Sequence, residues 1–140
     1  IMKLVKNVQK LPTALHISEA RIQIRNLRLR TYIGFNPEEK SKKQDIVVSA
    51  DIYYLADAAA ASDNEADALN YKIITKKIID HVEHCRFQLL EKLASDLLTI
   101  AAESERVSHA EVSVDKPHAL RFADSVSVTL SASRCRASSE

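Results

Sequence analysis

Glycine, cysteine and long apolar runs are scarce in this 140-residue sequence, and each scarcity excludes a class of protein. The single glycine, Gly34, excludes the glycine-rich loops that cradle phosphates in nucleotide-binding proteins. Two cysteines, Cys85 and Cys135, are too few and too unpatterned for a disulfide framework or a zinc site, so no metal is expected and a reducing, cytoplasmic setting fits. No apolar run approaches the ~20 residues of a membrane span, and the N-terminus shows no secretion signal.

Excess charge is also absent. Twenty lysines and arginines face 19 aspartates and glutamates, and the net charge of +1 gives no reason to expect nucleic acid or membrane as a partner. Hydrophobic residues make up 46% of the chain and charged residues 28%, which is typical of a soluble globular protein. We expect one domain over residues 19–134, an N-terminal extension over 1–18 and a C-terminal tail over 135–140.

Alternating apolar and polar residues predict strands of a half-buried sheet in the first half of the chain. Residues 21–33 alternate, and the parity changes at Arg25–Asn26, which predicts a β-bulge. A charged loop over 35–43 leads to a second alternating stretch, 44–56. The alanine-rich, acidic residues 57–67 are interpreted as a connection.

Apolar residues at helical spacing then predict two helices, over about 71–84 and 87–104. Two more strands are expected over 109–116 and 124–132. The order ββααββ predicts an α+β fold, a four-stranded antiparallel sheet with two helices on one face. Four strands leave two open edges, so we expect copies of the chain to join their sheets edge to edge in an oligomeric barrel.

Two charged residues, Glu91 and Lys116, stand where the pattern calls for apolar side chains. Glu91 shares a helical row with Phe87 and Ala94, and Lys116 follows the inward parity of its strand. A buried charge is costly unless it is paired or its pKa shifts. Glu91 is either paired with a neighbouring arginine or lysine, or anchors the planar N–C–NH₂ edge of a guanine or pterin ring. Lys116 either reaches water at the strand end or acts as a general base.

Four further side chains are candidates with a plain alternative beside each. Tyr71 is a core residue or a proton relay, and Glu39 is a solvated or a functional loop residue. His118 and Arg121 follow Lys116, and a histidine there is more often a surface residue than a catalyst. No pair of His, Cys, Asp or Glu residues has the spacing of metal ligands.

Four segments resemble the dihydroneopterin aldolase family, and the resemblance runs from about Ile22 to Ala132. The segments are the loop Ile33–Glu39, Asp67-Ala-Leu-Asn-Tyr71, Phe87-Gln-Leu-Leu-Glu91-Lys92 and Val114-Asp-Lys116-Pro-His-Ala-Leu120. The tract Asp115–Ser127 is more similar to one branch of the family, the dihydroneopterin triphosphate 2′-epimerases. The resemblance implies the tunnelling fold (T-fold), in which four subunits form a ring and two rings stack as a homo-octamer, with sites between neighbouring subunits.

The resemblance also implies roles for individual residues. Acid–base chemistry falls to Lys116, to Tyr71 of the adjacent subunit and to Glu39 of the opening loop. The implied substrate-binding residues are Glu91, Leu90, Leu69 and His118. Glu91 would grip the 2-amino and N3 edge of a pterin, and we hypothesise that His118 or Arg121 meets a triphosphate.

The implied chemistry is a retro-aldol step on the trihydroxypropyl side chain of dihydroneopterin or its triphosphate. The C1′–C2′ bond breaks and the pterin ring takes the electrons, so no cofactor is required. Re-addition to the opposite face of the aldehyde gives the 2′-epimer, of monapterin configuration, and this is the favoured function. Protonation at C1′ would instead give hydroxymethyl-dihydropterin and glycolaldehyde, which is the reaction of the aldolase of folate biosynthesis. A non-catalytic oligomer that binds pterins or purines is a third possibility, from another class.

Overall fold

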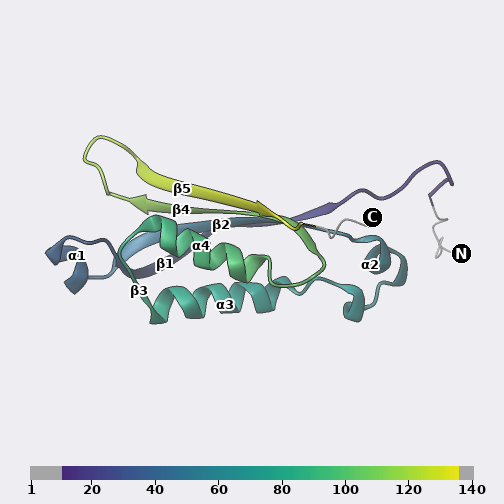
Figure 1. The fold of residues 1–140 in the computed structure, drawn as a ribbon, viewed down its shortest axis with the longest axis horizontal. Coiled ribbons are helices and arrows are strands. Elements are labelled where there is room, and N and C mark those ends of the chain that lie inside the picture. The colour runs from purple at the N-terminus through teal and green to yellow at the C-terminus, as the bar shows by residue number, and fades with distance from the viewer. Residues whose placement is uncertain (1–10, 136–140) are drawn as a thin grey trace, which may run out of the picture.

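A computed structural model describes residues 11–135 and shows an α+β fold, in which two long helices lie on one face of a sheet (Figure 1). Four long strands pair antiparallel in the order β1 (Ala20–Ile33), β2 (Gln44–Tyr54), β4 (Val107–Pro117) and β5 (Ser125–Ser133). A two-residue strand, β3 (Arg86–Phe87), pairs in parallel with the end of β1. The sheet is therefore five-stranded and mixed, which corrects the prediction of four antiparallel strands.

The two long helices are α3 (Tyr71–His84) and α4 (Leu90–Ala101). The predicted range of 71–84 is confirmed at both ends. As expected for an N-cap, the Asn70 side chain accepts hydrogen bonds from the N–H groups of Lys72 and Ile73 in the first turn. The prediction of a helix over 87–104 is wrong at both ends. Phe87 belongs to β3, where its carbonyl accepts a hydrogen bond from the N–H of Gly34 at 3.0 Å.

Short helices occupy two segments that were predicted to be loops. They are α1 (Pro37–Ser41) in the charged loop, and α2 (Asp57–Ser62) with the 3₁₀ turn η1 (Glu65–Asp67) in the acidic connection. None of the three buries a residue. The 3.6-residue apolar spacing that reveals a packed helix is therefore missing from them.

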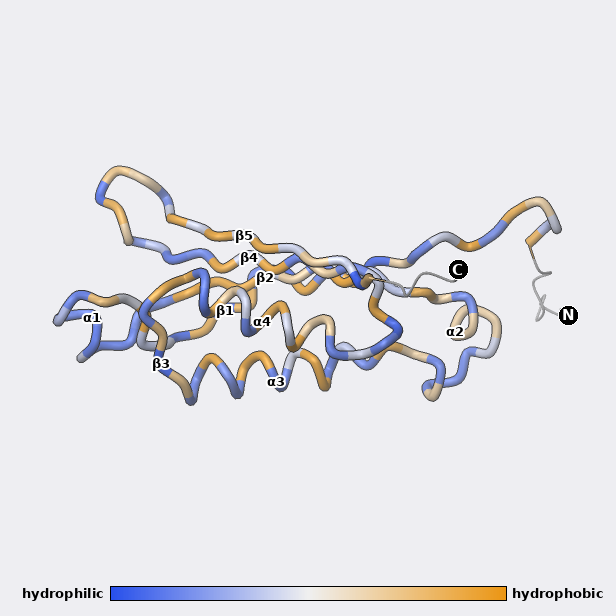
Figure 2. Tube along the Cα trace, in the orientation of Figure 1, coloured by the Kyte–Doolittle hydropathy of each residue, from blue (hydrophilic) through white to orange (hydrophobic). Residues whose placement is uncertain are grey.

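The core lies between the sheet and the two long helices, and Figure 2 shows apolar stretches on both layers. Its strand residues alternate as predicted: Val48, Ala50 and Ile52 of β2 pair with Val114, Val112 and Ala110 of β4, and Ile46 is buried on the same side of β2. The predicted bulge is confirmed, because the pairing of β1 with β2 shifts register between Ile24 and Leu27. Asn26 adopts a left-handed φ of 55° there, a conformation that asparagine tolerates better than most residues.

Most of the predicted N-terminal extension (1–18) and nearly all of the predicted C-terminal tail (135–140) lie outside the described residues. Within residues 11–135, no helix is both long enough and apolar enough to cross a membrane.

Candidate active site

The shortest ion pair among the described residues joins Lys116, near the end of β4, to Glu39 of α1. The Lys116 Nζ donates to the Glu39 Oε2 at 2.6 Å, and only 14% and 19% of the two side chains are exposed. Lys116 continues the inward parity of Val112 and Val114, as the sequence predicted. Its charge is met by a carboxylate 77 residues away, so the alternative in which it reaches water at the strand end is not what this structure shows.

Glu39 is held from several directions by its own loop. The N–H of Asn36 donates to Oε1 at 3.3 Å, and Asn36 O accepts from the N–H of Glu39 at 3.0 Å. Gln44 uses one amide nitrogen to bridge Ile33 O at 2.6 Å and Glu39 Oε2 at 3.4 Å. The carboxylate is thus fixed by the helix start and by the first residue of β2, before any ligand arrives.

Gly34 makes room for this carboxylate. Its φ is +130°, which L side chains rarely adopt, and a Cβ built there would lie 2.2 Å from the Glu39 Cδ. The only glycine of the chain therefore stands where both the backbone and the neighbouring side chain require one. Gly34 and Gln44 are positioning residues that sequence reasoning had not assigned, although the rarity of glycine was a usable signal.

The hydrogen bond from Lys116 is the main cause that holds the pKa of Glu39 below its ordinary value of 4.5. Burial acts in the opposite direction, and the bonds from Asn36 and Gln44 add to the lowering. Glu39 is therefore an anion at neutral pH, beside an ammonium group on a rigid strand. Such a pair can hold a hydroxyl-bearing substrate and move a proton to or from it.

A pocket of about 290 Å³ adjoins Glu39. Its lining residues are Tyr32, Gly34, Glu39, Lys40, Arg86, Phe87 and Gln88. They come from β1, α1, β3 and the turn after β3, so the two-residue strand that the sequence did not predict forms one wall. Among the described residues, no group of three or more His, Cys, Asp or Glu side chains is placed to hold a metal ion.

Glu91 does not lie in a buried stripe, and that prediction is wrong. The buried face of α4 consists of Leu93, Ala94, Leu97 and Ala101, and Glu91 is exposed in the first turn. Neither suggested cation pairs with it. Lys92 bonds Asp96 at 2.9 Å, and Arg86 stacks on the Tyr32 ring with its Cζ 3.8 Å from the centroid.

Leu90 precedes Glu91 and packs partly buried against the core, so these two candidates adjoin each other at the start of α4. His118 is exposed at the beginning of the turn between β4 and β5, where it adopts a left-handed φ of 66°. It lies two residues beyond Lys116, on the far side of Pro117.

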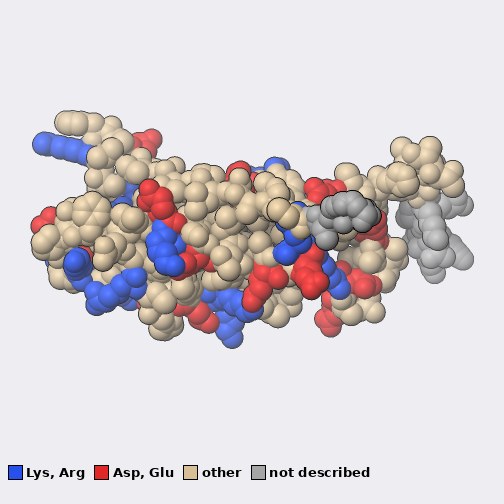
Figure 3. Space-filling model, in the orientation of Figure 1, with Lys and Arg blue, Asp and Glu red and all other residues tan. Residues whose placement is uncertain are grey.

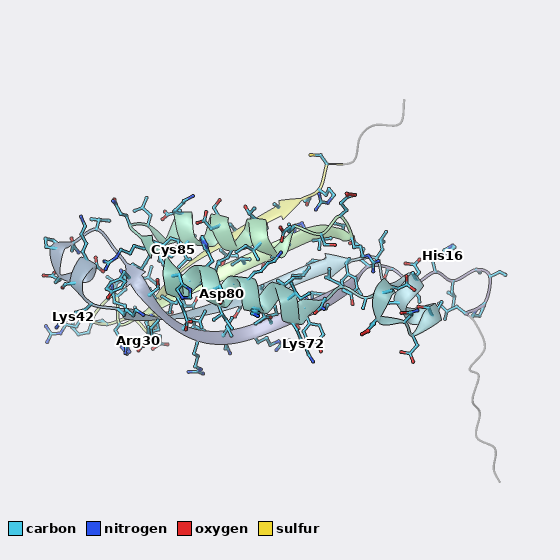
Figure 4. All side chains as sticks on the ribbon, turned by 90° about the horizontal axis from the view of Figure 1, so that it is seen from below. His16, Arg30, Lys42, Lys72, Asp80 and Cys85 are labelled. Atoms are coloured by element: carbon cyan, nitrogen blue, oxygen red, sulfur yellow. The ribbon has the colours of Figure 1, made fainter. Side chains whose placement is uncertain are left out.

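Tyr71 and Leu69 lie away from these groups within one chain. Tyr71 starts α3, whose other end leads into β3, and 14 helical residues span about 20 Å. Figure 4 shows the same separation between Lys72, next to Tyr71, and Lys42, which follows α1. Half of the Tyr71 side chain is exposed (50%), whereas Leu69 is buried (6%). The structure therefore brings Glu39 and Lys116 together, and leaves Tyr71 facing solvent elsewhere.

Known proteins resemble this chain over most of its length. The family model described as FolB, dihydroneopterin aldolase, matches residues 22–131. Two relatives named dihydroneopterin triphosphate 2′-epimerase are similar to it. That of Escherichia coli (strain K12) is 58% identical over 112 residues, which cover 80% of this chain and 93% of the relative. That of Pseudomonas aeruginosa is 53% identical over 116 residues, which cover 82% of this chain and 94% of the relative. The solved structure of E. coli dihydroneopterin aldolase in complex with neopterin matches with a TM-score of 0.76 at 27% identity (81% of this chain, 98% of that chain). The α+β fold predicted for the chain is thereby confirmed.

Proposed function

This chain is an enzyme of the dihydroneopterin aldolase family, and from that premise we propose that it interconverts 7,8-dihydroneopterin triphosphate and its 2′-epimer. The observation that carries the proposal is the Glu39–Lys116 pair, a proton-carrying lysine fixed at 2.6 Å from a carboxylate beside a pocket. Similarity to relatives named as epimerases supports the choice within the family.

In the proposed reaction Lys116 carries the proton. Lys116 acts as its neutral amine, after its ammonium proton has passed to water, and accepts the proton of the 2′-hydroxyl while the C1′–C2′ bond breaks. The electron pair moves into the C6=N5 imine of the ring, and N5 takes a proton from water. An enamine and an aldehyde that still bears the triphosphate result. When C1′ adds to the opposite face of the aldehyde, the bond forms again, the 2′ oxygen regains its proton and C2′ is inverted. Glu39 holds Lys116 and the side-chain hydroxyls in place.

Glu91 is proposed to anchor the pterin ring. Its carboxylate is exposed at the first turn of α4, and no ion pair of it is found among the described residues, so both oxygens are available to two parallel N–H donors. Leu90 adjoins it and would pack on the ring. His118 is proposed to contact the substrate side chain, because it follows Lys116 by two residues.

A complete site would take Tyr71 and Leu69 from a neighbouring copy, because α3 carries them about 20 Å from its other end. The sheet supports such assembly. In the described chain, β5 pairs on one side only, and the outer edge of β1 meets only the two residues of β3. Long unpaired edges favour pairing with another chain. We place four copies in each ring, two rings in an octamer, and the enzyme in the cytoplasm.

A product assay tests the function. The purified protein is incubated separately with dihydroneopterin triphosphate and with dihydroneopterin, and the products are separated. Conversion of the triphosphate to its 2′-epimer is expected. Predominant hydroxymethyl-dihydropterin with glycolaldehyde, or its triphosphate, would identify an aldolase instead. Binding of a pterin without turnover would identify a non-catalytic binding protein.

A further inference from the structure

Two cations lie against the ring of Tyr32 and a third lines the pocket beside it, and the proposed mechanism does not use them. The Arg86 Cζ lies 3.8 Å from the ring centroid and the Lys43 Nζ lies 5.9 Å from it. Lys40 lines the same pocket as Tyr32 and Arg86. We call Lys40, Lys43 and Arg86 the Tyr32 cation cluster. Its members come from α1, from the residue before β2 and from β3, so the fold and not one segment brings them together.

Hydrogen bonds from arginine side chains to the backbone carbonyls of the two lysines hold the cluster in place. The Arg86 guanidinium donates to Lys40 O at 2.9 Å, which joins β3 to α1. The Arg30 guanidinium donates to Lys43 O at 2.9 Å, which fixes the residue before β2. The arginine is thus stacked and hydrogen-bonded before a ligand binds, and it retains further N–H donors.

The positive charge of the cluster is not neutralised by neighbouring carboxylates. No ion pair within residues 11–135 involves Lys40, Lys43 or Arg86. The carboxylates nearest in the sequence are engaged elsewhere, because Asp45 bonds Arg30 at 3.3 Å and Glu39 bonds Lys116 at 2.6 Å. Glu38 alone adds an exposed negative charge in α1. Figure 3 shows lysine and arginine side chains gathered around α1 and β3. An uncompensated group of cations at a pocket attracts a polyanion.

The pocket brings two cations of the cluster close to Glu39, the partner of Lys116, because Glu39, Lys40 and Arg86 all line it. In dihydroneopterin triphosphate the phosphates hang from C3′, the carbon next to the C2′ that is inverted. We infer that the Tyr32 cation cluster binds the triphosphate of the substrate, with Arg86 giving paired N–H donors and the two lysines acting as point charges. This inference rests on the proposed function, and it names the part of the site that recognises the phosphates.

The cluster would also decide the fate of the cleaved substrate. Once C1′–C2′ breaks, the triphosphate stays on the aldehyde, so the cations retain the fragment that must be added back. An aldehyde held at the enamine re-adds and gives the epimer, whereas a released one leaves the enamine to be protonated at C1′. The ratio of epimer to hydroxymethyl-dihydropterin therefore reports on the cluster independently of the KM.

The test uses the full chain and its Lys43→Gln and Arg86→Gln variants, with Lys76→Gln, an exposed lysine of α3, as matched control. We expect each cluster variant to raise the KM for dihydroneopterin triphosphate by about tenfold, the loss of one hydrogen bond to a charged group. The ratio of epimer to hydroxymethyl-dihydropterin should fall. The KM for unphosphorylated dihydroneopterin should rise by a smaller factor, because that substrate carries no phosphates, and the thermal midpoint verifies that each variant is folded. Lys76→Gln should change none of these quantities.

Two failures can be told apart. If the unmodified enzyme produces no epimer from the triphosphate, the proposed function fails. If it produces the epimer while both cluster variants retain its KM and product ratio, the cluster inference is overturned and the function stands. Calorimetric titration with inorganic triphosphate measures anion binding at the cluster in the absence of catalysis. Binding that is lost in Arg86→Gln supports the inference, and equal binding by both proteins overturns it.

Discussion

At the scale of single residues, Glu39 and Lys116 each offset the cost of burying the charge of the other. A lysine that is only 14% exposed would be costly alone, and the carboxylate at 2.6 Å compensates it. Substrate hydroxyls that enter the pocket would join a hydrogen-bond network that already has donors and acceptors in place. Preorganised polar groups of this kind need little rearrangement during the reaction.

The roles proposed for Lys116 and Glu91 predict opposite kinetic defects. Lys116→Ala removes the proton carrier, so kcat should fall by roughly 10² to 10⁴-fold with little change in KM. Glu91→Ala removes two charge-assisted hydrogen bonds to the ring, so KM should rise by roughly 10 to 100-fold. Steady-state kinetics of the two variants check this. If Lys116→Ala changed mainly KM and Glu91→Ala mainly kcat, the assignments would be reversed.

Gly34→Ala should damage the site through Glu39. The new Cβ would fall 2.2 Å from the Glu39 Cδ, at a φ of +130°. Backbone strain of about 1–3 kcal/mol and a displaced carboxylate should lower both the thermal midpoint and kcat. In a Glu39→Ala background the clash is gone, so the same substitution should cost less stability there. Equal losses of unfolding free energy in both backgrounds would show that Gly34 does not act through Glu39.

The burial predicted for Lys116 is confirmed and that predicted for Glu91 is wrong, because the parity of a strand defines its buried side more sharply than apolar spacing defines the face of a helix. The parity of a strand is exact, so Lys116 inherited the buried side from Val112 and Val114. Leu93, Ala94, Leu97 and Ala101 define the buried face of α4, and Glu91 lies outside that face in the first turn. Phe87 fits helical spacing, but its backbone pairs with β1, so it does not belong to that face.

At the scale of elements, α3 and α4 are tied together by Asp96. Its carboxylate bonds the His81 side chain of α3 at 2.8 Å and Lys92 of its own helix at 2.9 Å. Burial raises the pKa of Asp96, but the hydrogen bonds from Lys92 and His81 outweigh it, so the pKa lies below the ordinary value of 3.8. The folded state therefore favours the ionised carboxyl.

This shift predicts a stability difference that depends on pH. A lowered pKa stabilises the fold above the unfolded value of 3.8, and the contribution disappears as pH falls through the folded value. Asp96→Asn should lose about 1–2 kcal/mol of unfolding free energy at pH 7, and the difference from the parent should shrink below pH 3.8. Urea unfolding at one protein concentration and several pH values measures it. Asp80→Asn, an exposed aspartate of α3, is the control; a loss independent of pH would contradict the assignment.

The elements that the sequence revealed are those that bury a periodic face. Four strands, α3 and the bulge were predictable because alternation, helical spacing and the Asn70 cap all agree. The elements that were missed have no such face. β3 has two residues, and α1 exposes its whole surface, yet both of them build the pocket. Glu39 and Lys116 were therefore predictable as individual candidates, whereas their pairing and the wall of the pocket were not.

At the scale of the whole molecule, the separation of Tyr71 from Lys116 predicts that two copies share each site. Tyr71→Phe and Lys116→Ala are each expected to be nearly inactive. If both are unfolded, mixed in equal amounts and refolded together, about a quarter of the sites should combine an intact Lys116 with an intact Tyr71 from a neighbour. Epimerase activity of the mixture measures the recovery. A mixture no more active than its separate components would place both residues of a site in one chain.

The enzyme is proposed to invert C2′ by breaking and remaking the C1′–C2′ bond. The most direct measurement starts two reactions, one from dihydroneopterin triphosphate and one from its 2′-epimer, and follows both by chromatography. Both reactions should reach the same mixture of epimers, with little hydroxymethyl-dihydropterin, and Lys116→Ala should slow both equally. Steady accumulation of hydroxymethyl-dihydropterin from either epimer, without interconversion, would contradict the claim.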